Sequence, residues 1–254
     1  MPLIPGHRPR ILACALLLMV APATAQPLAP APEAATGRIA KATATAQRFM
    51  VAAANPLAAA AGRDILRAGG SAVDAAIAVQ LVLNLVEPQS SGLGGGAFLV
   101  HWDEAARRVI TLDGRETAPA AAKPDRFIGP DGKPMRFVDA VVGGRSVGVP
   151  GTPRLLEEAH RRWGKLPWPQ VLAPAIRLAE DGFAVSPRLN GLLSGERNLA
   201  KDARAAAYFY EADGRAKAVG TILRNPAFAA TLRALAERGA GAFYEGEIAR
   251  DIVA

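Results

Sequence analysis

Three features of this sequence have residue types that could do chemistry: a glycine-rich run, an arginine after a strand-like segment, and isolated histidines. The run from Gly92 to Gly96 invites a phosphate-binding interpretation. A P-loop, however, continues from its glycines into Lys and Ser or Thr, and a dinucleotide fingerprint follows a strand and opens a helix. Here a helical pattern precedes the glycines and a strand-like run follows them, which disfavours nucleotide binding. We expect a tight helix-to-strand turn in which glycine permits positive φ and close backbone packing.

The arginine stands in the stretch Asp113-Gly114-Arg115-Glu116. Gly114 would let the chain turn and present Arg115, whose planar guanidinium matches a carboxylate through two parallel hydrogen bonds. The alternative is a surface arginine paired with Asp113 or Glu116, a contact that contributes little to stability. Residue types alone leave both interpretations open.

The histidines offer little chemistry by their spacing. His101 lies in a strand-like run and His160 in a helical one, and neither has a partner at metal-ligand spacing. No Gly-x-Ser-x-Gly motif and no evident Ser/His/Asp set occurs. We therefore expect no metal site and no cofactor.

Capping residues mark the helices that must position these side chains. Asn55-Pro56 and Asn225-Pro226 each combine a capping Asn with a Pro that has no N–H to leave unpaired. Leu57, Ala61 and Ile65 are expected to line the buried face of the first helix. A second helix, capped by Ser71 and running to about residue 85, is apolar nearly all round, which predicts burial.

The order of elements predicts the fold class. Strand-like runs at Ala97–Trp102 and Arg108–Asp113 are joined by a short connection that is typical of a hairpin. Residues 114–153 are rich in loops and turns. Helices are predicted at about 153–163, 169–181 and 226–238. Helices, a hairpin and further helices indicate an α+β fold rather than alternating βαβ units.

Composition excludes several classes of protein. The chain has 254 residues, of which 50% are hydrophobic but only 6% aromatic, and it contains one Cys. These values exclude a disordered tail, a disulfide scaffold and a fibrous rod. The formal net charge of +7 is spread in short mixed clusters, without a basic stripe interleaved with aromatic residues, so nucleic acid is not an expected partner.

The N-terminus has the pattern of an export signal. Two arginines without an acid precede the apolar run Ile11–Val20, and a small-x-small site ends at Ala25. This pattern predicts a secretory signal peptide over residues 1–25, because the apolar run is too short to span a bilayer. Residues 26–48, rich in Ala, Pro and Thr, read as a flexible leader. We expect an exported protein, periplasmic or secreted, that is not held in a membrane after signal removal.

A series of stretches resembles the γ-glutamyltransferase family, also called γ-glutamyltranspeptidase or glutathione hydrolase. In chain order they are Asn55–Ala58 with Ala68–Ala76, Glu87-Pro88 with Ser91–Gly96, Asp113–Pro119, Ser146–Gly151, Ala173–Ile176 with Ala179–Phe183, and Gly241–Tyr244. The resemblance runs from about Met50 to the end of the chain. It assigns residues 49–254 to the family's large-subunit region, incomplete at the C-terminus.

The resemblance implies an N-terminal-nucleophile hydrolase with an αββα sandwich, of which this chain holds the large-subunit part. Such an enzyme cleaves itself into two subunits, and a threonine at the new N-terminus attacks γ-glutamyl amides such as glutathione. The glutamyl group then passes to water, an amino acid or a peptide. Arg115 matches the family's arginine that binds the α-carboxylate of the γ-glutamyl group, and Gly92–Gly96 would shape the wall of the site.

The resemblance also implies that the catalytic nucleophile is not among these residues. No threonine after the signal precedes a Thr-Thr-His-like or Thr-Ser-His-like sequence. The nucleophilic threonine is therefore expected beyond Ala254, with no catalytic residue in this chain, which alone would be inactive. Two alternatives stay open: a truncated, non-catalytic exported protein that binds glutamyl compounds, and a related acylase acting on β-lactam side chains. Arg115 favours glutamyl specificity over the acylase.

Overall fold

The computed structural model describes residues 42–254, so the predicted signal peptide and most of the predicted leader lie outside the described residues. The helices are α1 (Pro56–Arg67), α2 (Ala72–Val86), α3 (Phe137–Val141), α4 (Thr152–Trp163), α5 (Trp168–Asp181), α6 (Pro187–Gly195), α7 (Ala203–Phe209), α8 (Pro226–Arg238), α9 (Gly241–Tyr244) and α10 (Glu247–Val253). Short 3-10 turns occupy Gly144–Ser146 and Leu199–Lys201. The strands are β1 (Ala97–Asp103), β2 (Arg108–Gly114), β3 (Phe183–Ala184) and β4 (Ile222–Leu223). This mixture confirms the α+β class.

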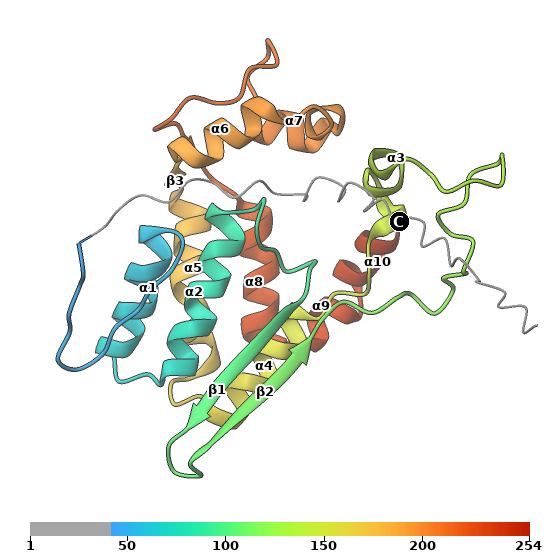
Figure 1. Ribbon diagram of the computed structural model, residues 1–254. Coiled ribbons are helices and arrows are strands. Elements are labelled where there is room, and N and C mark those ends of the chain that lie inside the picture. Colours follow the sequence, from blue (N-terminus) through green and yellow to red (C-terminus); the bar gives the residue numbers. More distant parts are fainter. Residues whose placement is uncertain (1–41) are drawn as a thin grey trace, which may run out of the picture. The chain divides into compact units, whose positions relative to one another are not determined.

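Helices α1, α2, α5 and α8 stand side by side and form the main helical layer (Figure 1). The capping predictions for the two Asn-Pro pairs are confirmed. The side chain of Asn55 accepts a hydrogen bond from the N–H of Leu57 at 3.0 Å, and that of Asn225 accepts one from Phe228 at 2.9 Å. Both helices therefore begin where the cap satisfies an N–H that the helix itself leaves unpaired.

Helix α2 is the centre of this layer, because it contacts α1, α5 and α4. Its largest fully buried side chains are Ile77, Leu81, Val82 and Val86, as its apolar composition predicted. In α1, Ala61 and Ile65 are buried as expected, but the placement of Leu57 on the buried face was wrong. Leu57 is 40% exposed, and the adjacent Ala58 is fully buried instead. The buried face of α1 is thus rotated by one residue at its N-terminal end.

A buried carboxylate fastens the start of α2 to the connection between α4 and α5. Asp74 is fully buried, and with Ser71 it forms a reciprocal capping box. Its Oδ2 also accepts hydrogen bonds from the backbone N–H groups of Lys165 at 2.9 Å and Leu166 at 3.1 Å. One carboxylate oxygen thereby satisfies donors from two segments about 90 residues apart in the chain.

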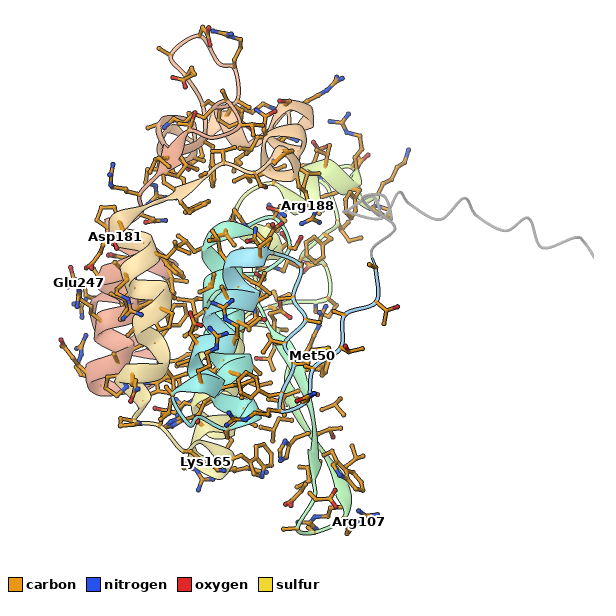
Figure 2. All side chains as sticks on the ribbon, turned by 90° about the vertical axis from the view of Figure 1, so that its left-hand side faces the viewer. Met50, Arg107, Lys165, Asp181, Arg188 and Glu247 are labelled. Atoms are coloured by element: carbon orange, nitrogen blue, oxygen red, sulfur yellow. The ribbon has the colours of Figure 1, made fainter. Side chains whose placement is uncertain are left out.

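Strands β1 and β2 form the predicted antiparallel hairpin, paired from Ala97 with Gly114 to Asp103 with Arg108. The tip of the hairpin projects beyond the helices at Arg107, which has a positive φ of 50° (Figure 2). The inner face packs on α4. The outer face is apolar and exposed, with Phe98 at 66% and Val100 at 72% of their accessible surface.

The region after α5 contains elements that the sequence patterns did not predict. Helices α6 and α7 lie there, together with the short pairing of Phe183 with Leu223. This pairing joins residues 40 positions apart, so no local pattern signals it. Within residues 42–254, no helix has the length and apolarity that crossing a membrane requires.

Candidate functional site

Three of the motif stretches, far apart in sequence, meet at the base of the hairpin. The carbonyl oxygen of Gly95 accepts hydrogen bonds from the N–H of Gly151 at 3.0 Å and from the N–H of Thr152 at 3.1 Å. The Thr152 hydroxyl donates to the same oxygen at 3.1 Å. These bonds hold the glycine turn to the start of α4. The pairing of Ala97 with Gly114 joins the end of β2 to the same turn, and Arg115 is the next residue after this strand.

Glycine is required here by close approach of backbones. A Cβ on Gly96 would lie 2.6 Å from the Gly114 carbonyl oxygen, and one on Gly151 would overlap the same atom. The prediction of close packing at the glycine turn is confirmed. The prediction of positive φ was wrong, because none of the glycines with positive φ falls between Gly92 and Gly96. The turn needs glycine for space rather than for a left-handed backbone.

Arg115 is fixed at its backbone and exposed at its side chain. Its N–H donates to the Asp113 carboxylate at 2.8 Å, which sets the direction of the chain as it leaves β2. Its Nε lies 3.4 Å from Glu116 Oε2, and 69% of the Arg115 side-chain surface is exposed. The surface contact with Glu116 considered in the sequence is therefore present, but it leaves most of the guanidinium available to a ligand.

Glu116, which the sequence offered only as an ion-pair partner, lies deeper than Arg115. Its side chain is 29% exposed, and its carboxylate packs on the glycine turn, where a Cβ on Gly96 would lie 2.7 Å from Oε2. That oxygen is buried and accepts no hydrogen bond from the described residues. The charge of this carboxylate is met by the Arg115 guanidinium, whose Nε forms the 3.4 Å ion pair with the same oxygen.

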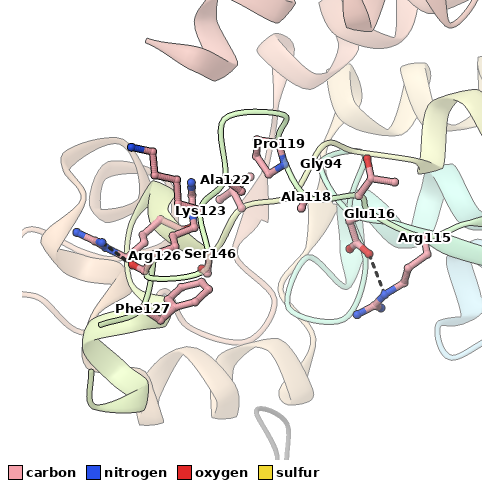
Figure 3. Close-up of a pocket in the computed structure, with 14 residues that line it drawn as sticks. Gly94, Arg115, Glu116, Ala118, Pro119, Ala122, Lys123, Arg126, Phe127 and Ser146 are labelled. Atoms are coloured by element: carbon pink, nitrogen blue, oxygen red, sulfur yellow. Dashed lines mark hydrogen bonds and ion pairs between the residues drawn. The ribbon is translucent and has the colours of Figure 1, made fainter. Parts of the chain in front are cut away.

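A cavity of about 550 Å³ opens between Arg115 and the loop that follows it (Figure 3). Its volume is in the range of small-molecule sites. The lining residues are Gly94, Arg115, Glu116, Thr117, Ala118, Pro119, Ala122, Lys123, Arg126, Phe127, Arg145, Ser146, Val147 and Gly148. Arg115 and Glu116 lie on one side, and Lys123, Arg126 and Phe127 lie on the other. Of these residues Gly94, Arg115–Pro119 and Ser146–Gly148 belong to the motif stretches, whereas the basic residues at 123, 126 and 145 carry no motif signal.

A second cavity of about 460 Å³ shares Arg115 and Thr117 with the first and extends toward α4 and α9. Its far wall includes Tyr244, from the last motif stretch. The Tyr244 hydroxyl donates to the Pro150 carbonyl at 2.8 Å and accepts from the N–H of Arg154 at 3.3 Å. Burial raises the pKa of the Tyr244 hydroxyl, so it keeps its proton and remains a donor at neutral pH. Tyr244 therefore braces the segment that carries Gly151.

His101 and His160 make packing and hydrogen-bond contacts that are typical of structural residues. The His101 ring packs on Trp163 with ring centroids 4.4 Å apart. The His160 Nε2 lies 2.8 Å from the Leu166 carbonyl oxygen and 3.8 Å from Asp74 Oδ1. Among residues 42–254, no three His, Cys, Asp or Glu side chains are grouped so that they could hold a metal ion.

Comparison with known proteins identifies a family and several relatives of this chain. The sequence model described as gamma-glutamyltranspeptidase matches residues 58–254. A glutathione hydrolase proenzyme of Bacillus subtilis is 39% identical over 203 residues, covering 80% of this chain and 34% of the relative. An acylase ACY 1 proenzyme of a Pseudomonas species is 39% identical over 228 residues, covering 87% of this chain and 40% of the relative. The chain thus spans about a third of the length of the first of these relatives.

The fold is also that of solved relatives. The crystal structure of Helicobacter pylori gamma-glutamyltranspeptidase superposes with a TM-score of 0.78 at 31% identity, covering 83% of this chain and 60% of that one. The expectation of an N-terminal-nucleophile hydrolase fold, present here in part, is confirmed by this likeness.

Proposed function

The chain belongs to the γ-glutamyltranspeptidase family, and we propose that it forms the large-subunit part of an enzyme that cleaves γ-glutamyl amides such as glutathione. The observation that carries the proposal is Arg115. It is an exposed guanidinium on a rigid base of three converging backbones, at the junction of two cavities.

In the proposed complex, Arg115 binds the α-carboxylate of the γ-glutamyl group through two parallel N–H···O bonds. Its Nε is oriented by Glu116 at 3.4 Å, and the remaining N–H groups face solvent and the cavities. A bidentate pair of this kind fixes both the position and the plane of the carboxylate. The γ-carbonyl of the substrate would then point away from Arg115 at a defined distance.

The proposed reaction has two acyl transfers. A threonine hydroxyl, freed by self-cleavage of the precursor and located outside residues 1–254, attacks the γ-carbonyl carbon. The C–N bond breaks, an ester forms, and the amine leaves with the proton from the hydroxyl. Water or an acceptor amine then cleaves the ester, returns a proton to the threonine oxygen and releases glutamate or a new γ-glutamyl amide. This scheme uses no cofactor and no metal ion.

We also propose export to the periplasm or the medium, directed by residues 1–25. The support is the basic start, the apolar run Ile11–Val20 and the small residues before the cleavage site after Ala25. N-terminal sequencing of the protein recovered from the periplasm and from the medium tests this: a mature start at Gln26 is expected, and a cytoplasmic protein starting at Met1 would contradict it.

The acylase is the second candidate, since the Pseudomonas acylase is also 39% identical to this chain. The two candidates differ in what they require at the α-carbon. A γ-glutamyltransferase recognises a substrate that bears both an α-carboxylate and an α-ammonium group. A glutaryl amide retains the carboxylate but lacks the ammonium group, so it separates the two candidates.

The test is hydrolysis by the gene product, expressed from its own start codon to its own stop codon. We expect release of 4-nitroaniline from γ-glutamyl-4-nitroanilide, at least tenfold faster than from glutaryl-4-nitroanilide. Faster cleavage of the glutaryl compound would support the acylase instead. Absence of cleavage of either compound would support a non-catalytic binding protein.

A further inference from the structure

The cavity beside Arg115 has an excess of positive charge that the α-carboxylate alone does not account for. Four cationic side chains line it, at Arg115, Lys123, Arg126 and Arg145, against one acidic side chain, Glu116. Glu116 lies next to Arg115, on the opposite side of the cavity from Lys123 and Arg126 (Figure 3). Three cations therefore share one end of the cavity without an acid. We call Lys123, Arg126 and Arg145 the distal cluster.

Two members of the distal cluster hold each other in place. Arg126 Nε donates to the Arg145 carbonyl at 2.6 Å, and Arg145 Nη1 donates to the Arg126 carbonyl at 2.7 Å. A guanidinium has five N–H donors. Each arginine uses one of them in this pairing, and the others can donate to a ligand. The two like charges are thereby kept close together, an arrangement that an anion between them stabilises.

The acidic residues of the surrounding loop do not neutralise the distal cluster. Asp139 pairs with Arg136, its Oδ2 lying 2.6 Å from Nε. Asp131 accepts from the backbone N–H of Lys133 at 3.1 Å. Asp125 is exposed and does not line the cavity. Within residues 42–254, no ion pair joins an acid to any member of the distal cluster.

From this arrangement we infer that the distal cluster binds a second carboxylate, carried by the amine part of the γ-glutamyl substrate. The inference rests on the proposed function, because Arg115 must hold the α-carboxylate at the other end. The substrate class is then γ-glutamyl peptides with a free carboxylate on the leaving amine. Since that carboxylate stays on the amine when the C–N bond breaks, the distal cluster contacts the first product as well.

The test compares two substrates that differ only in this charge, γ-glutamylglycine and γ-glutamylglycinamide, with the gene product. We expect kcat/KM for the acid to exceed that for the amide about tenfold at low ionic strength, as three positive charges near one carboxylate imply. This preference should fall as salt is added, because exposed charges are screened.

Lys123→Gln is the decisive variant, because the Lys123 ammonium makes no hydrogen bond or ion pair within the described residues and its loss should leave the fold intact. It should lower the acid-to-amide preference about threefold, the effect of one exposed ion pair. Lys133→Gln, on the same loop but outside the cavity, should leave the preference unchanged.

The outcomes separate the two proposals. Equal cleavage of acid and amide by the unaltered protein overturns the distal cluster as a carboxylate site and leaves the proposed function standing. An acid-to-amide preference that is as large in Lys123→Gln as in the unaltered protein at every salt concentration also overturns it. If neither substrate is cleaved, the proposed function itself fails, and the inference that rests on it fails too.

Discussion

The helical layer and the segment from Arg115 to Gly151 differ in how much of each is buried. Helix α2 alone buries ten of its residues, whereas no residue from 115 to 151 is buried. That segment is instead held at its ends by backbone bonds, from Thr117 to Val149 and from Gly151 to Gly95. The layer gains stability from apolar packing. The segment contributes exposed cations on a backbone frame, and its side chains are therefore available to a ligand.

The largest expected effect on stability comes from truncating a buried side chain in the helical layer. Leu172, in α5, is fully buried, and Leu172→Ala should lower the free energy of unfolding by about 2–5 kcal/mol, through lost burial and the cavity left behind. Phe137, in α3, is 52% exposed, and Phe137→Ala should change stability by about 0.5 kcal/mol or less. Urea unfolding of both variants measures the difference. Similar losses would mean that the segment is packed as tightly as the layer.

A smaller but still large effect is expected at Asp74. Asp74→Ala removes the acceptor of three backbone N–H groups, from Ser71, Lys165 and Leu166. Loss of a cap and of buried acceptors should cost about 2–4 kcal/mol. Asp213, which also accepts from nearby N–H groups but is 53% exposed, is the matched control, and Asp213→Ala should be much milder. Equal effects of the two changes in thermal unfolding would show that burial is not what makes Asp74 matter.

The smallest expected effect is a change of stability with pH, caused by a carboxyl group at the edge of the second cavity. Hydrogen bonds from Arg161 and Arg162 lower the pKa of the Glu158 carboxyl from 4.5 to about 2. Since the folded pKa lies below the unfolded one, the stabilising contribution is complete above about pH 4.5 and is lost as the pH falls through about 2. An NMR titration should give a Glu158 midpoint near 2, and Arg161→Ala should raise it. A midpoint of 4.5 in the unaltered protein would contradict the observed pairing.

The contrast between the helical layer and the segment from Arg115 to Gly151 also explains what the sequence could predict. Caps and periodicity are local, so the helices that begin after Asn55, Ser71 and Asn225 were predicted nearly to the residue. Arg115 was singled out because a strand end and a flanking glycine are local as well, whereas its assignment to the α-carboxylate came from the family resemblance and stays a prediction. The meeting of Gly95 with Gly151 and the arrival of Arg145 beside Arg126 join positions 56 and 19 residues apart. No periodicity encodes such contacts, so the cavity and the distal cluster could only be found in three dimensions.

The most direct test of the central claim removes either the arginine or the carboxylate that it is proposed to bind. The two substrates are γ-glutamyl-4-nitroanilide and 4-aminobutyryl-4-nitroanilide, which lacks the α-carboxylate. Arg115→Ala should lower kcat/KM for the first about 10- to 150-fold, the effect of losing charge-assisted hydrogen bonds worth roughly 1.5–3 kcal/mol. The slow cleavage of the second should be unchanged, and Arg108→Ala, on the hairpin, should affect neither. An equal loss on both substrates, or no loss on either, would contradict the assignment of Arg115 to the α-carboxylate.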